Sequence, residues 1–115
     1  RHNAQSLTAK LGTVAGIKTP GSAEDNHIYV YYPLTIDADR RDSLRRYLLR
    51  HRIDSKVTDM SDCARLKTFQ DPADGPPAPG ETMDASLLEI CVYPQIPNSE
   101  MGRIAEVIRA WAADE

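Results

Sequence analysis

The sequence predicts an α/β domain of the two-layer α+β kind, in which a small sheet of about three strands packs against helices. Apolar residues alternate strictly over residues 27–36, as in a half-buried strand, whereas over residues 101–111 they recur every three or four positions, as on the buried side of a helix. The chain has 115 residues, of which 41% are hydrophobic, and this is enough for one core. We therefore expect residues 1–115 to form a single domain.

The first element is expected to be a helix within residues 1–16. Apolar residues spaced three and four apart would form its buried side, namely Ala4, Leu7, Leu11 and Val14. Gly12 and Gly16 are candidate stops. Residues 19–22, Thr-Pro-Gly-Ser, then predict a turn before the first strand.

The strand expected at residues 27–36 has two different faces. One face is apolar and suits a layer of helices, with Ile28, Val30, Tyr32, Leu34 and Ile36. The other face is amphipathic, with Tyr29, Tyr31, Pro33 and Thr35. Because proline cannot donate a backbone hydrogen bond, Pro33 predicts that its end of the strand lies at an unpaired edge.

A helix followed directly by a short strand is expected between residues 39 and 57. Asp39 is a suitable N-cap, and one helix face carries Leu44, Tyr47, Leu48 and His51. Residues 53–57 can extend as a short strand.

The remaining residues predict an irregular segment, a flexible loop, a last strand and a last helix. Residues 58–70 contain Met60, Leu66 and Phe69, which we expect to pack on the core. Residues 71–80 are rich in proline and glycine and form the flexible loop. Alternating Leu88, Ile90 and Val92 predict the last strand. Asn98 or Ser99 would cap a final helix with a wide apolar stripe made of Met101, Ile104, Val107, Ile108 and Trp111.

Composition argues against several classes of function. The formal net charge is −3, so no overall positive field favours nucleic acid as a partner. The tyrosines near residue 30 lack the basic, glycine-rich segment of RNA-binding strands. No apolar run approaches the roughly 18 residues of a membrane span, and the start does not resemble a secretory signal. We expect a cytoplasmic protein.

Metal and disulfide chemistry are not indicated either. Cys63 and Cys91 are far apart in sequence and form neither a disulfide framework nor a Cys-x-x-Cys metal site. We expect two buried free thiols in a reducing compartment, with a bridge between them as the alternative. The aspartates between residues 37 and 62 lack the glycine turn of a calcium loop, and we expect no metal site.

In the order of its residues the whole chain resembles the C-terminal small domain of the DegT/DnrJ/StrS sugar aminotransferases, fold type I enzymes that use pyridoxal phosphate. The matching segments are residues 1–11 (its interdomain helix), 16–20 (its Gly-Ile…Pro turn), 27–34 (its His-containing strand), 41–53 (its second helix), and 88–94 with 100–108 (its last strand and helix). The chain departs from the family where Arg52 replaces the usual glycine. Arg52 must take a left-handed conformation, at roughly 1 to 2 kcal/mol, or end the helix differently.

The resemblance implies that catalysis resides outside these residues. The lysine that bonds the cofactor is expected upstream, since none of the chain's lysines matches its position: Lys10, Lys18, Lys56 and Lys67. We therefore expect neither a catalytic nor a cofactor-binding residue in this chain, which would not act alone.

The resemblance also implies partners and a site. The complete protein would be a homodimer that binds pyridoxal phosphate, a nucleotide sugar and an amino-acid donor, and this domain would close the cleft over the keto-sugar nucleotide beside an upstream large domain. Lys56, Thr58 and Asp59 would face substrate, with plain surface as the alternative. His27 is a further substrate-facing candidate, for which a structural hydrogen bond is the alternative.

A second class of function remains open. A two-layer fold of this size also serves proteins without a cofactor. The alternative is a non-catalytic α/β ligand-binding or assembly module.

Overall fold

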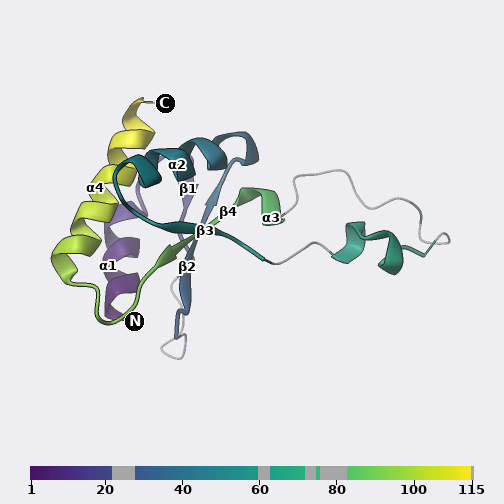
Figure 1. The fold of residues 1–115 in the computed structure, drawn as a ribbon, viewed down its shortest axis with the longest axis horizontal. Helices are drawn as coiled ribbons and strands as arrows, with labels where there is room; N and C mark the ends of the chain where they lie inside the picture. Colours follow the sequence, from purple (N-terminus) through teal and green to yellow (C-terminus); the bar gives the residue numbers. More distant parts are fainter. Residues whose placement is uncertain (22–27, 60–62, 72–74, 76–82, 115) are drawn as a thin grey trace.

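The computed structural model describes residues 1–21, 28–59, 63–71, 75 and 83–114. Within them the fold is mixed α/β, with an antiparallel sheet in the order β1-β2-β4-β3 (Figure 1). Its strands are β1 (Ile17–Lys18), β2 (Tyr31–Ile36), β3 (Ser55–Val57) and β4 (Leu87–Cys91). β1 was not predicted from the sequence, because two residues are too few to show an alternation.

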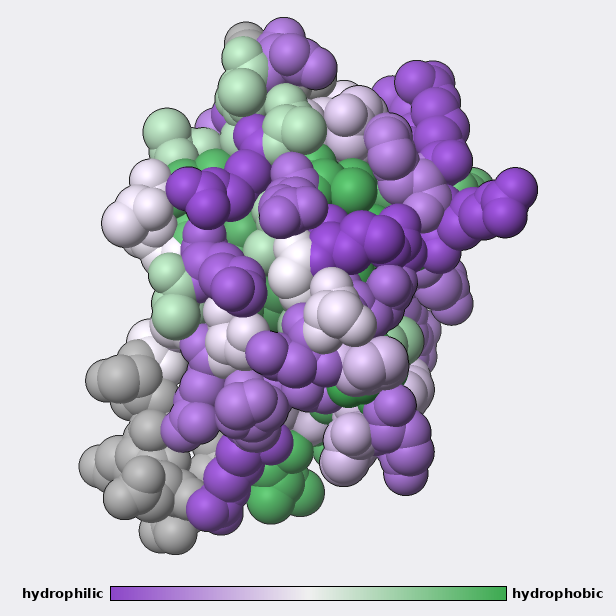
Figure 2. Space-filling model, turned by 90° about the vertical axis from the view of Figure 1, so that its left-hand side faces the viewer, coloured by the Kyte–Doolittle hydropathy of each residue, from purple (hydrophilic) through white to green (hydrophobic). Residues whose placement is uncertain are grey.

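Three longer helices pack on one face of the sheet (Figure 1). They are α1 (His2–Leu11), α2 (Ala38–Arg50) and α4 (Asn98–Asp114). The outer surface over α1 and α4 is largely hydrophilic (Figure 2), because the apolar stripe of each helix is turned toward the sheet. The remaining helical pieces are short: α3 (Met83–Ser86) and the 3-10 turns η1 (Cys63–Arg65) and η2 (Lys67–Phe69).

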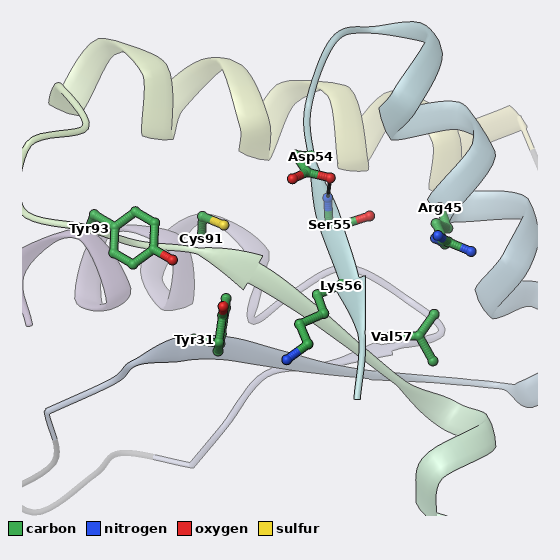
Figure 3. A pocket seen from close by; sticks show the side chains of 8 residues that line it. All are labelled: Tyr31, Arg45, Asp54, Ser55, Lys56, Val57, Cys91 and Tyr93. Carbon is green, nitrogen blue, oxygen red and sulfur yellow. Dashed lines mark hydrogen bonds between the residues drawn. The ribbon is translucent and has the colours of Figure 1, made fainter. Parts of the chain in front are cut away.

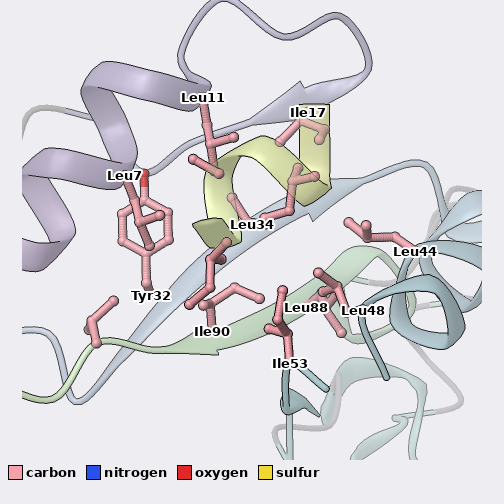
Figure 4. Close-up of a cluster of buried hydrophobic side chains, with 14 of the residues drawn as sticks. Leu7, Leu11, Ile17, Tyr32, Leu34, Leu44, Leu48, Ile53, Leu88 and Ile90 are labelled. Carbon is pink, nitrogen blue, oxygen red and sulfur yellow. The ribbon is translucent and has the colours of Figure 1, made fainter. Parts of the chain in front are cut away.

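The hydrophobic core lies between these helices and the sheet (Figure 4). Leu7 of α1, Leu48 of α2 and Ile108 of α4 meet Leu34 and Ile90 of the central strands, and all five are fully buried. Burying one such side chain contributes about 1.5 to 3 kcal/mol. The apolar face predicted for residues 32–36 and the stripe predicted for the last helix are confirmed.

The first helix ends earlier than residue 16. Its last residue is Leu11, and the backbone N–H of Gly12 donates to Thr8 O. Gly16 has φ +75, and a Cβ there would come within 2.6 Å of Arg40 Nη1. The left-handed backbone favours glycine at this position, whereas the guanidinium is the flexible end of a side chain and can move aside. The chain turns here into β1.

Of the strand expected at residues 27–36, the described residues 28–30 do not belong to β2, which begins at Tyr31. Tyr29 has φ 40, and this breaks the alternation, because side chains change sides regularly only in an extended backbone. Tyr29 packs against the core with its ring centroid 6.1 Å from that of Tyr32. Ile28 and Val30 are 75% and 63% exposed, so their predicted inward orientation is wrong.

The end of α2 explains how Arg52 replaces a glycine. Arg52 has φ 58 and adopts the left-handed conformation. Its N–H donates to Leu49 O, and the N–H of Ile53 donates to Leu48 O, both at 3.0 Å. These two bonds, with buried Leu48 next to buried Ile53, form a Schellman motif. At the other end Asp37 is the N-cap residue, so Asp39 lies in the first turn.

The segment after β3 does not contribute to the core as expected. Leu66 and Phe69 are 43% and 66% exposed, since η1 and η2 lie apart from the sheet and its helices (Figure 1). Cys63 is exposed and not buried as expected, and Met60 lies outside the described residues. Of the flexible loop predicted at residues 71–80, only Asp71 and Gly75 are among the described residues. The helices seen in the described ranges are all too short or too polar to cross a membrane.

Candidate functional site

The face of the sheet opposite the helices carries a second set of side chains. Tyr31 pairs with Cys91 across β2 and β4, and Lys56 of β3 pairs with Glu89 of β4. Paired residues of neighbouring strands point to the same side. Because Tyr32 and Ile90 point into the core, these residues point away from the helices. We call this the open face.

A groove of about 530 Å³ lies at the β3 end of the open face (Figure 3). Its lining from the sheet and the chain that follows β4 comprises Tyr31, Ser55, Lys56, Val57, Cys91 and Tyr93. Arg45 of α2 and Asp54 complete it. Asp54 Oδ1 accepts a 2.9 Å hydrogen bond from the backbone N–H of Ser55, which holds this carboxylate at the start of β3.

Lys56 supplies a fixed positive charge in the groove. Its Nζ lies 2.6 Å from Asp59 Oδ2 and 5.1 Å from the centroid of the Tyr31 ring. The hydrogen bond with Asp59 raises the pKa of Lys56 above its ordinary value, so the amine is an ammonium at neutral pH. An ammonium over a tyrosine ring is a cation–π contact, and it keeps the charge near the floor of the groove.

Two tyrosines form the aromatic part of the groove. The ring centroids of Tyr31 and Tyr93 are 6.5 Å apart, with an interplanar angle of 59°, which is a favourable tilted arrangement. Hydrogen bonding with Tyr31 raises the pKa of Tyr93. The Tyr93 hydroxyl is therefore neutral near pH 7 and can donate or accept a hydrogen bond.

Cys91 lies beside these rings without being an activated nucleophile. Partial burial raises the pKa of its thiol, and the charge of Asp54 raises it further. The thiolate is the reactive form of cysteine, so this environment favours an inert thiol.

Pyridoxal phosphate does not fit the groove as a covalently held cofactor. Such binding needs a neutral amine that condenses with the cofactor aldehyde. Among the described residues, Lys56 is the one lysine that lines the groove, and Asp59 holds it in the charged form. No reaction step can therefore be assigned to that cofactor within the described residues.

The site residues predicted from the sequence do not all lie at the groove. Lys56 lines the groove, and Asp59, 83% exposed at its side chain, is joined to it by the ion pair. Thr58 is 9% exposed and is not part of the lining. His27 lies outside the described residues. Whether these residues face a substrate stays a prediction.

Three residues that line the groove were not predicted as site residues from the sequence, namely Tyr93, Cys91 and Arg45. The predicted faces of the first strand did place Tyr31 away from the core. What the sequence lacked was the strand pairing that sets Tyr31 opposite Cys91. An aromatic residue directly after the end of a predicted strand, as Tyr93 is after Val92, would have been the available indication.

Comparison with solved structures finds this fold within aminotransferases. An aminotransferase, TlmJ, from Streptoalloteichus hindustanus matches 99% of this chain with a TM-score of 0.74 and 20% identity. DesV from S. venezuelae, solved in complex with a ketimine intermediate, matches 96% with a TM-score of 0.74 and 21% identity. 3-Amino-5-hydroxybenzoic acid (AHBA) synthase matches 99% with a TM-score of 0.73 and 15% identity.

These matches show the fold and not the activity. The chain spans 31%, 30% and 33% of the lengths of the three structures. No protein-family model and no curated protein sequence matches it. The chain thus has the mixed α/β architecture of about one third of an aminotransferase.

Proposed function

We propose that this chain is the C-terminal small domain of a pyridoxal-phosphate-dependent sugar aminotransferase of the DegT/DnrJ/StrS kind. The observation that carries the proposal is the fold match, which covers 99% of this chain and only 31% of TlmJ. The residue order resembles the same family from end to end. In the complete protein the chain would help to close the active-site cleft.

The groove supports a role in holding substrate. The ammonium of Lys56 attracts an anionic group such as a phosphate, and the rings of Tyr31 and Tyr93 offer a flat surface to a sugar or a base. Arg45, exposed on α2, adds a second cation to the lining. Closing such a wall over a cleft excludes water and orients the bound molecule.

The rest of the machinery would come from outside this chain. The cofactor would be held by an upstream large domain, which supplies its lysine, and pyridoxal phosphate when bound provides the electron sink for amino transfer. We propose a cytoplasmic homodimer that takes an amino-acid donor and a nucleotide sugar bearing a keto group.

Expression of the complete coding sequence tests the proposal. The complete protein should take up pyridoxal phosphate with a visible absorbance band, which borohydride removes without return of colour, and should transfer an amino group to a keto-sugar nucleotide. The 115-residue chain alone should do neither. A complete protein that takes up no cofactor would contradict the proposal and favour a non-catalytic binding or assembly module.

A further inference from the structure

A buried amide joins the N-terminal helix to the chain segment that carries Tyr93. Asn3, in the first turn of α1, is only 6% exposed. Its Nδ2 donates to Tyr93 O at 2.8 Å and to Ile96 O at 3.1 Å. Both acceptors are carbonyl oxygens, so the side-chain amide of Asn3 must face them with its nitrogen and not its oxygen. Each of the two hydrogens on that nitrogen makes one of the two bonds. The contact spans about 90 residues of sequence.

The segment held by Asn3 is a tight connection between β4 and α4. The N–H of Ile96 donates to Tyr93 O at 3.0 Å, so this carbonyl accepts from both the turn and the helix. Pro94 and Pro97 restrict the backbone on either side. Few backbone conformations are open to this connection, and Asn3 holds the point from which the Tyr93 side chain enters the groove.

We propose that Asn3 is a positioning residue for the groove: through the carbonyl of Tyr93 it fixes the Tyr93 ring beside Tyr31, so that the place of α1 sets the shape of this end of the groove. A consequence for substrate binding rests on the proposed function. The positioning itself concerns this chain alone and can be tested without a ligand.

Two other polar contacts of α1 do not reach the groove and provide controls. Ser6 Oγ donates to Asn98 Oδ1 at 3.3 Å on the surface. Thr8 Oγ1 lies 2.7 Å from the hydroxyl of Tyr32, whose side chain belongs to the core. Ser6→Ala and Thr8→Val therefore weaken the attachment of α1 while leaving the Tyr93 carbonyl untouched.

The experiment is nuclear magnetic resonance on the 115-residue chain with ¹³C-labelled tyrosine. In Asn3→Ala the Tyr93 ring should lose its contacts to the Tyr31 ring, and the raised pKa of Tyr93 should fall toward its ordinary value because the hydrogen bond between the two hydroxyls is lost. Ser6→Ala and Thr8→Val should keep both properties. An unchanged Tyr93 in Asn3→Ala, or an equal change in Thr8→Val, would overturn the proposal.

A measurement on the unsubstituted chain covers the case in which Asn3→Ala does not fold. A scalar coupling transmitted through the hydrogen bond should connect the side-chain nitrogen of Asn3 to the carbonyl carbon of Tyr93, and the side-chain amide protons should exchange slowly. Fast exchange of these protons without such a coupling would show that the amide does not hold the carbonyl.

Discussion

The two faces of the central strands differ in what they contribute. On the helix side, Leu34 and Ile90 are fully buried. On the open face their chain neighbours Pro33, Glu89 and Cys91 are half-buried. Alternate residues of the same strands thus serve the core and the groove. A substitution should change stability on one face and binding on the other.

The largest expected effect contrasts two adjacent residues of β4. Ile90→Ala leaves a cavity in the core and should lower the free energy of unfolding by about 2 to 5 kcal/mol. Cys91→Ala on the open face should change it by less than about 1 kcal/mol. Urea denaturation of both variants measures the difference. Equal losses would mean that the open face is also packed in solution.

The second expected effect concerns substrate binding and compares the substitution of a lysine in the groove with that of a lysine outside it. In the complete protein Lys56→Ala should lower kcat/KM for a nucleotide-sugar substrate about tenfold, the loss expected for one charge-assisted contact. Lys10→Ala, an exposed lysine at the end of α1, is the matched control and should leave kcat/KM unchanged. Thermal unfolding should not distinguish either variant from the parent. A lower kcat/KM in both variants would show that Lys56 has no specific role in binding the substrate.

The helix side could be predicted from the sequence because its pattern is long and regular. The stripe of α4 runs from Met101 to Trp111, and each of its turns repeats the same choice of apolar residues. A short strand or a residue with an unusual backbone conformation has no such repeated pattern. β1 has two residues, and the left-handed backbone of Tyr29 is not visible in an alternation that continues through it.

The open face could be predicted only in part. The alternation in β2 placed Tyr31 away from the core, and the resemblance singled out Lys56. Their meeting depends on strand order, because β4 lies between β2 and β3 and brings Cys91 and Glu89 into register with them. Asn3 and Tyr93 are 90 residues apart, and no local pattern indicates a contact at that distance.

A third expected effect lies at the junction that leads from the core to the groove. Arg52→Gly should raise the free energy of unfolding by about 1 kcal/mol, because glycine adopts the left-handed backbone without the penalty of a Cβ. Arg50→Gly, inside the last turn of α2, should lower it by about 0.5 to 1 kcal/mol. The two substitutions are chemically identical, and urea denaturation should give opposite signs. A loss in both variants would show that the side chain of Arg52 contributes more than its backbone strain removes.

The smallest expected effect is electrostatic and confined to the groove. Asp59→Asn should lower the pKa of Lys56 toward its ordinary value, since the hydrogen bond with Asp59 is the main cause of the raised pKa. Asp54→Asn is the control, because Asp54 contacts the backbone of Ser55 and not Lys56.

The sign of the pH dependence follows from that shift. A pKa raised by folding adds stability that is fully present below the pKa of the unfolded chain and is lost as pH rises through the folded value. Because the pair is solvent-exposed, this stabilisation should be too small for urea denaturation to resolve. Titration of the Lys56 side chain by nuclear magnetic resonance should still detect it. If Asp59→Asn leaves the pKa of Lys56 unchanged, the ion pair is not formed in solution.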